Sequence, residues 1–196
     1  MIVPIVEGHA ERESIPVFVR RLLNDQGVHD IPVRPGFRVH RDKVVKPGEL
    51  ERTLETALSE ASARALILLL DADDDCPATL GATLLGRGVI SAAGHPLGVI
   101  LAKKELEAWF IAGIESLRGQ RGIRGDATCP ADPESIQGAK GWLTEHMEGG
   151  RTYVEVDDQP ALIANFDYGT AARRSRSLRK FLAEVTLLRQ ALAAEP

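Results

Sequence analysis

A run of six apolar residues that ends abruptly in acids is the feature that most constrains this fold. Residues 65–70 read ALILLL, and residues 71–75 read DADDD. The apolar run shows no alternation with polar residues, which is typical of a central strand buried on both faces, as in a parallel sheet. A solvated charge run seldom follows such a strand directly, so the acids at its end are candidates for a function.

Two further apolar runs and the segments between them predict the rest of the core. Residues 2–6 (IVPIV) and 97–101 (LGVIL) read as buried strands, and residues 37–40 as a shorter one. Helices are expected over residues 10–24 and 77–93. Another is expected after Pro47-Gly48, with an inner face made of Leu50, Leu54, Ala57, Leu58 and Ala61. Strands that alternate with helices indicate an α/β fold with a mainly parallel sheet flanked by helices.

The C-terminal part of the chain has a different pattern. Residues 117–133 are rich in Gly, Arg and Pro and predict a long loop or lid. Helices are expected over 134–147 and, as a C-terminal extension, over 169–194. We therefore divide the chain into a core, residues 1–116, and a loop and helical extension, residues 117–196. At 196 residues the two are expected to pack as one compact unit.

Composition limits the classes of function. The net charge is −4, so binding to nucleic acid would need a local basic patch. Cys76 and Cys129 are far apart, which argues against a disulfide framework or a zinc site. With no signal peptide pattern and no apolar run long enough for a membrane span, we expect a cytoplasmic protein with no membrane contact.

Acidic residues follow all three apolar strands. The carboxyl ends of parallel strands line one crevice, so these side chains are expected to converge. They are Glu7 and Glu11 after the first strand, Asp71 and Asp73 after the second, and Glu105 and Glu107 after the third. Crowded carboxylates repel unless a cation neutralises them, and their hard oxygen ligands favour Mg²⁺ or Mn²⁺. The alternative is that some of these acids lie at helix N-termini only because the helix dipole favours negative charge there.

The ordered set of motifs resembles a known superfamily. EGHAE, LLLDADDD and AKKELEAWF, each after a strand, are similar to the acidic motifs of Toprim domains. More closely, the chain resembles domain-of-unknown-function family 4276. Members are similar to the nuclease half of OLD-type (overcoming lysogenisation defect) systems and are often encoded beside an ATPase. The resemblance covers nearly the whole chain, including GAKGWLTEHM, Tyr153, Asp158-Gln159 and SRSLRKFL.

The resemblance implies a Toprim-like fold and a role for each acid. Glu7 matches the Toprim glutamate, a metal ligand or general base, and Glu11 matches the second acid of an ExxxE variant. Asp71 and Asp73 match the metal-binding DxD pair. Glu105 is the best match for the acid after the third strand, with Glu107 as the alternative. The implied metal ligands are Glu7, Asp71, Asp73 and Glu105, and the implied catalytic set adds Glu11. A catalytic lysine is also implied, with Lys103, Lys104 and Lys140 as candidates.

Basic residues gather near the start of the final predicted helix. Arg173, Arg174, Arg176 and Lys180 are predicted to bind a phosphate backbone, where Lys and Arg displace counterions. The alternative is an ordinary solvated helix face.

Together these observations predict a Mg²⁺- or Mn²⁺-dependent phosphodiesterase, a nuclease acting on DNA or RNA. The resemblance places it in a defence or toxin-like system with an ATPase partner. The alternative is a non-catalytic, metal-binding regulatory subunit of an ATPase complex.

Overall fold

The structure, a computed structural model, describes residues 1–59 and 63–194. Its centre is a four-stranded, all-parallel sheet with the strand order β2-β1-β3-β4. The strands are β1 (Ile2–Val6), β2 (Phe37–Arg38), β3 (Ala65–Asp71) and β4 (Leu97–Ala102). This arrangement confirms the predicted α/β class with a parallel sheet flanked by helices. The second strand is shorter than predicted, with two residues in place of four.

Helices connect the strands and continue beyond them. The helices are α1 (His9–Asp25), α2 (Arg41–Val44), α3 (Glu49–Ser59), α4 (Pro77–Ser91), α5 (Ala108–Ala112), α6 (Ala139–Glu145), α7 (Glu155–Asn165), α8 (Tyr168–Arg174) and α9 (Arg176–Ala194), with 3-10 turns η1 (Ile114–Leu117) and η2 (Pro133–Ser135). Ala61, expected on the inner face of α3, lies outside the described residues. Within the two described stretches, the structure contains no helix that is long and apolar enough to cross a membrane.

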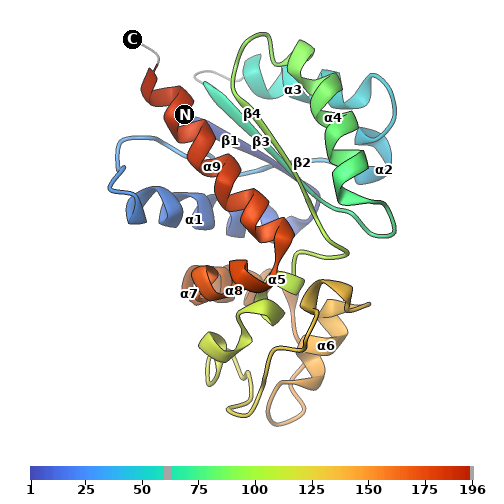
Figure 1. Cartoon of the computed structure of the whole chain (residues 1–196), viewed down its shortest axis with the longest axis vertical. Coiled ribbons are helices and arrows are strands. Elements are labelled where there is room, and N and C mark those ends of the chain that lie inside the picture. The colour runs from blue at the N-terminus through green and yellow to red at the C-terminus, as the bar shows by residue number, and fades with distance from the viewer. Residues whose placement is uncertain (60–62, 195–196) are drawn as a thin grey trace.

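The sheet is buried on both faces, as its apolar strands require. Side chains of β3 alternate, so Ile67 and Leu69 join the core beneath α1 and α9. Leu66, Leu68 and Leu70 join a second core beneath α3 and α4. Figure 1 shows these two helix layers on opposite sides of the sheet. An unbroken apolar run therefore serves both layers at once.

The order of the strands creates a switch point between β1 and β3. From β1 the chain crosses through α1 to β2 at one edge, and β3 and β4 then extend the sheet in the other direction. In open parallel sheets, ligands bind in the crevice at the carboxyl ends of the strands at such a point. Glu7 directly follows β1, and Asp71 is the last residue of β3. The fold thus puts two of the predicted acids on either side of the switch point.

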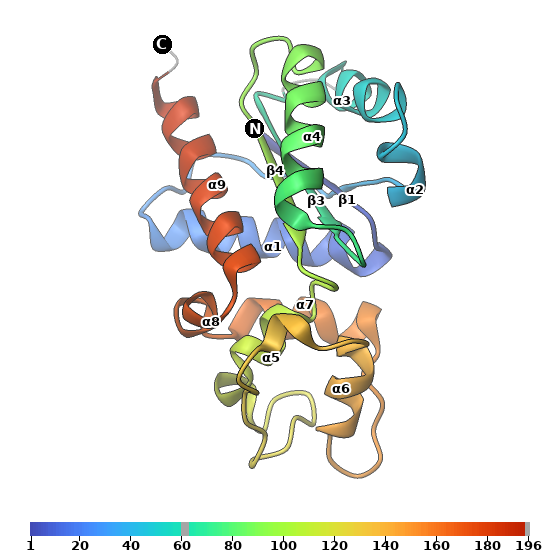
Figure 2. The same ribbon diagram turned by 45° about the vertical axis from the view of Figure 1, so that its right-hand side comes forward.

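A helical lobe built from α5 to α8 lies beyond the carboxyl ends of the strands (Figures 1 and 2). The chain enters this lobe after β4 and returns with α9, which packs against β4, β3 and α1. Aromatic rings join the parts, because Phe18 of α1 stacks on Phe181 of α9 and also contacts Phe166 and Trp109. The lobe therefore covers the edge of the sheet at which the acids emerge. The predicted division after residue 116 stays a prediction.

Two predicted helices are wrong in extent. The helix expected over 134–147 is broken, because Gly138 adopts a left-handed conformation (φ +68°) before α6 begins. The helix expected over 169–194 is interrupted at Ser175, whose backbone is extended (φ −120°, ψ 118°). Helix α7 was not predicted, since Pro160 within it is a residue that usually marks a helix boundary.

Candidate functional site

Carboxylates that follow three different strands interact electrostatically at the switch point. Burial raises the pKa of Asp71 well above its usual range, and the charges of Glu11, Glu107 and Glu7 raise it further. The N–H of Leu106, which donates to Asp71 Oδ1 at 2.9 Å, opposes this shift. Each of the three sequence-distant acidic segments therefore contributes to a single cluster, as expected from parallel strands.

Glu7 has an oxygen without a partner inside the protein. Among the described residues, its buried Oε2 accepts no hydrogen bond. Burial raises the pKa of Glu7, and the neighbouring Asp73 raises it further, whereas Arg41 lowers it. An orphaned buried oxygen is costly unless something else satisfies it. It is therefore an observation that points to an external partner, such as a cation or water.

Glu11 supports the loop that carries Glu7. Its Oε2 accepts hydrogen bonds from the main-chain N–H groups of Glu7 (3.0 Å) and Gly8 (2.8 Å), which caps the start of α1. Burial raises the pKa of Glu11 to about 7. A Cβ atom at Gly8 would lie 3.0 Å from Glu155 Oε1 and 3.3 Å from the Glu11 carboxyl carbon. The glycine thus lets the acids approach the main chain closely.

The two aspartates of the DADDD run have different surroundings. Asp71 faces the buried cluster, whereas the Asp73 side chain is 59% exposed at its rim. Asp73 also has a positive φ of 49°, a conformation that few residues other than glycine adopt. The predicted pair therefore spans the border between the buried acids and solvent.

The residue after β4 that joins the cluster is Glu107. Its side chain is 1% exposed, and its Oε1 accepts hydrogen bonds from Tyr153 Oη (3.0 Å) and Gln159 Nε2 (3.3 Å). Gln159 is in turn fixed by Ser14 Oγ at 2.6 Å. Glu105 Oε1 instead accepts from the N–H of Ala139 at the start of α6 (3.2 Å). The structure thus brings Glu107, the alternative that the sequence left open, beside Asp71.

Of the three candidate lysines, Lys140 is the one placed among the acids. Its Nζ lies 2.6 Å from Glu155 Oε2. Burial lowers the pKa of Lys140, but the charges of Glu107, Glu155 and Asp71 outweigh it and raise the pKa above its usual value. Lys104 pairs with the exposed Asp74 at 2.8 Å.

Sequence reasoning missed two charged members of this site. Glu155 begins α7, a helix that was not predicted. Arg41 follows a strand of only two residues and looks like an ordinary surface arginine in the sequence HRDK. Its one signal in the sequence was its position directly after the strand predicted over residues 37–40.

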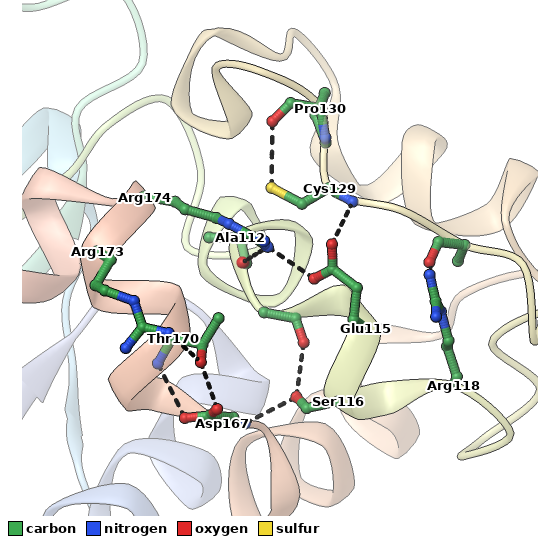
Figure 3. Close-up of polar contacts among 12 residues, drawn as sticks. Ala112, Glu115, Ser116, Arg118, Cys129, Pro130, Asp167, Thr170, Arg173 and Arg174 are labelled. Carbon is green, nitrogen blue, oxygen red and sulfur yellow. Dashed lines mark hydrogen bonds and ion pairs between the residues drawn. The ribbon is translucent and has the colours of Figure 1, made fainter.

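The predicted phosphate-binding residues lie at the end of α8 (Arg173 and Arg174, drawn in Figure 3) and in the first turns of α9 (Arg176 and Lys180). Arg174 pairs with Glu115 at 2.7 Å and donates to the carbonyl of Ala112, and Arg173 donates to Thr170 Oγ1 at 2.8 Å. Lys180 pairs with Glu184. Arg176 is exposed, and its main-chain N–H donates to Glu134. Several of these cations thus already serve structural contacts, and their binding to nucleic acid stays a prediction.

The chemistry of the cluster suits a hard divalent cation. The acidic side chains of the cluster are carboxylates, the ligand type that Mg²⁺ and Mn²⁺ prefer. The Glu7 oxygen that has no partner among the described residues belongs to this cluster. In residues 1–59 and 63–194, no group of three or more His, Cys, Asp or Glu side chains already has the close arrangement of a metal site. The donor types fit such an ion, and Glu7 and Asp71 are the residues best placed to hold it.

These contacts define an α/β protein with buried carboxylates at the switch point of a parallel sheet. The model of the family described as Domain of unknown function (DUF4276) matches residues 6–186. The chain therefore belongs to this family. Comparison with curated proteins and with solved structures finds no significant match.

Proposed function

We propose that the chain is a Mg²⁺- or Mn²⁺-dependent phosphodiesterase that cleaves nucleic acid. One observation carries the proposal, namely that the charges of Glu7, Glu11 and Glu107 act on the buried Asp71 at the switch point, where Oε2 of Glu7 has no hydrogen bond among the described residues. Crowding buried negative charges costs stability, so a protein that keeps them gains from a cation that neutralises them. Phosphoryl chemistry is the common use of such carboxylate sites.

Glu7 and Asp71 would hold the ion, with Asp73 contributing from the rim. Of the two glutamates after β4, Glu107 is the better candidate, since its charge raises the pKa of Asp71, whereas Glu105 accepts a hydrogen bond from the N–H of Ala139. A bound ion would supply charge stabilisation and an activated water at a phosphodiester. The proposal therefore keeps Glu7, Asp71 and Asp73 of the ligand set predicted from the sequence. After β4 it favours Glu107 over Glu105.

The surrounding residues would orient these carboxylates and hold the substrate. Glu11 fixes the main chain at Glu7 through two hydrogen bonds. Tyr153 and Gln159 fix Glu107. The ammonium of Lys140, which is held above its ordinary pKa by the acids, would stay protonated and stabilise the negative charge of a phosphate.

The biological setting rests on resemblance. The acidic motifs are similar to those of Toprim domains and of OLD-type nucleases. We therefore propose a cytoplasmic nuclease of a defence or toxin-like system, whose ATPase partner controls cleavage of DNA or RNA. The exposed Arg176 and its basic neighbours on α8 and α9 would contact the phosphate backbone.

The direct test is cleavage by the purified chain. Plasmid DNA, single-stranded DNA and total RNA are incubated with Mn²⁺, Mg²⁺ or EDTA, and the products are resolved on gels. Wild type is compared with Asp71→Asn and Glu7→Gln, which keep the shape of each side chain and remove its charge. Asp126→Asn is the control, because Asp126 is an exposed acid that pairs with the nearby Arg124, away from the switch point.

The proposal predicts metal-dependent cleavage by wild type and Asp126→Asn that both site variants lack. Melting curves with Mn²⁺ and with EDTA accompany the assay, because an ion that binds the folded state raises the melting temperature. A Mn²⁺-dependent rise without cleavage of any substrate, even after addition of a candidate ATPase partner, would favour the non-catalytic regulatory subunit. Cleavage retained by both site variants would refute the mechanism.

A further inference from the structure

Arg41, the first residue of α2, connects its guanidinium to the loop that follows β3. Its Nε donates to the carbonyl of Asp71 at 3.0 Å, and its Nη2 donates to the carbonyl of Ala72 at 3.2 Å. The same group pairs with the carboxylates of Asp73 (3.5 Å) and Asp75. One side chain thus binds the main chain and the acids of the DADDD segment together.

The segment that carries Arg41 also contacts the other acidic loop. Val39 donates its N–H to the carbonyl of Val6 at 2.8 Å, next to Glu7. Arg38 Nε donates to the carbonyl of Glu7 itself at 3.1 Å. The short segment of residues 38–41 therefore links the loop after β1 to the loop after β3, on either side of the switch point.

The loop that Arg41 binds has a backbone that needs support. Asp73 has φ +49°, and its N–H donates to the carbonyl of Lys104 at 3.2 Å. The N–H of Asp75 closes a turn on the carbonyl of Ala72 at 2.9 Å. Such a conformation in a non-glycine residue persists only where surrounding contacts over-determine it, and it is often found at functional sites.

We propose that Arg41 is a positioning residue that holds the loop of residues 71–75 so that Asp71 and Asp73 present their carboxylates to a divalent cation. The inference rests on the proposed metal-dependent function. Arg41 is suited to this role because its planar fork reaches two carbonyl groups at once, whereas a lysine carries the charge on a single nitrogen. Its side chain is only 13% exposed, so these bonds are shielded from water.

A counter-ion role alone does not account for these contacts. A cation that only neutralised Asp73 and Asp75 would have no need to donate to two successive main-chain carbonyls. Those two bonds go to main-chain carbonyls and not to the carboxylate of Asp71, so the positioning contact does not compete with a bound ion for that carboxylate. The lysine substitution separates the roles, since it retains the charge and removes the forked contact.

The test compares Arg41→Lys with Arg87→Lys. Arg87 is a matched control at the other end of α2, because it also donates to two successive main-chain carbonyls, those of Val45 (2.9 Å) and Lys46 (2.7 Å), and not to the loop of residues 71–75. It pairs with a carboxylate as well, that of Glu51. The measurements are the Kd for Mn²⁺ from electron paramagnetic resonance and hydrogen exchange of the amides of residues 72–75 in EDTA.

We expect Arg41→Lys to raise the Kd for Mn²⁺ by about tenfold or more, the effect typical of residues that orient metal ligands. Its loop amides exchange faster than those of wild type, and Arg87→Lys changes neither quantity. A Kd within twofold of wild type for Arg41→Lys, or an equal rise for Arg87→Lys, would overturn the inference and leave the proposed function standing. If wild type binds no Mn²⁺, the proposed function fails. If hydrogen exchange of the amides of residues 72–75 in Arg41→Lys is then also unchanged from wild type, the positioning role of Arg41 fails as well.

Discussion

Glu134 offers a prediction whose magnitude follows from its contacts. This buried carboxylate, 4% exposed, receives four hydrogen bonds at the break between α8 and α9. Oε1 accepts from Ser175 Oγ (2.8 Å), Ser177 N (2.9 Å) and Ser177 Oγ (2.5 Å), and Oε2 accepts from Arg176 N (3.0 Å). The carboxylate thus replaces the partners that the first N–H groups of α9 lack.

The perturbation is Glu134→Gln, which keeps the shape of the side chain. An amide nitrogen would replace Oε2 and face the N–H of Arg176, so two donors would meet. An unsatisfied buried donor costs about 1–3 kcal/mol, and loss of the negative charge at a helix start costs about 0.3–1 kcal/mol. We therefore expect Glu134→Gln to lower the free energy of unfolding by about 2–3 kcal/mol at pH 7.

The same contacts predict how this loss depends on pH. Burial raises the pKa of Glu134, but the hydrogen bonds from Ser177, Ser175 and Arg176 outweigh burial, and the net pKa in the folded state is lowered. The stabilisation is then fully present above the unfolded pKa, roughly 4.3, and is lost as the pH falls towards the lower folded pKa. The gap between wild type and Glu134→Gln should shrink over this range.

Urea unfolding followed by circular dichroism, at pH 7 and at steps down to pH 3, measures both quantities. Glu148→Gln is the control, because Glu148 is exposed and surface changes of this kind stay within about 0.5 kcal/mol. A loss below about 1 kcal/mol for Glu134→Gln at pH 7 would refute the reasoning, since it is less than one unsatisfied donor costs. A gap that does not change with pH would refute the role of the charge.

Three further variants test other parts of the structure. Burial and the neighbouring carboxylates raise the pKa of Asp71, so its ionised form opposes folding at high pH. In calorimetry with EDTA, Asp71→Asn should therefore have a higher melting temperature than wild type at pH 8. The difference should shrink towards pH 5, where less of the wild-type carboxyl is ionised. Gly36→Ala should cost about 1–3 kcal/mol in urea unfolding, because its Cβ would lie 3.2 Å from the Arg12 Cα. Tyr153→Phe removes a donor to Glu107 and should lower the free energy of unfolding by roughly 1–2 kcal/mol, also measured in urea.

Most of the sheet could be predicted from the sequence because β1, β3 and β4 are buried on both faces. Unbroken apolar runs such as ALILLL leave few alternatives, and the acids at their ends mark the carboxyl edge. Glu7 and Asp71 could thus be placed together without coordinates. Helix α1 was predicted within one residue at each end, because its apolar positions repeat with helical spacing.

The rest depended on contacts between distant segments. The sequence near Glu105 and Glu107 does not show which of them joins the cluster. Tyr153 and Gln159 hold Glu107 there, whereas Ala139 binds Glu105, and all three partners are distant in the sequence. The break at α8 and α9 likewise falls within a continuous helical pattern and is produced by Glu134, about forty residues earlier in the chain. Local periodicity carries no information about such partners.

The place of β1 in the sheet has a consequence for the nascent chain. β1 and α1, which packs on it, are made before β3, the partner of β1 in the sheet, which begins at Ala65. A ribosome adds roughly 5–20 residues per second, so the apolar strand IVPIV waits for seconds without its neighbours. During that time its apolar side chains are exposed to aggregation, so a chaperone that binds this segment during translation should raise the yield of folded protein.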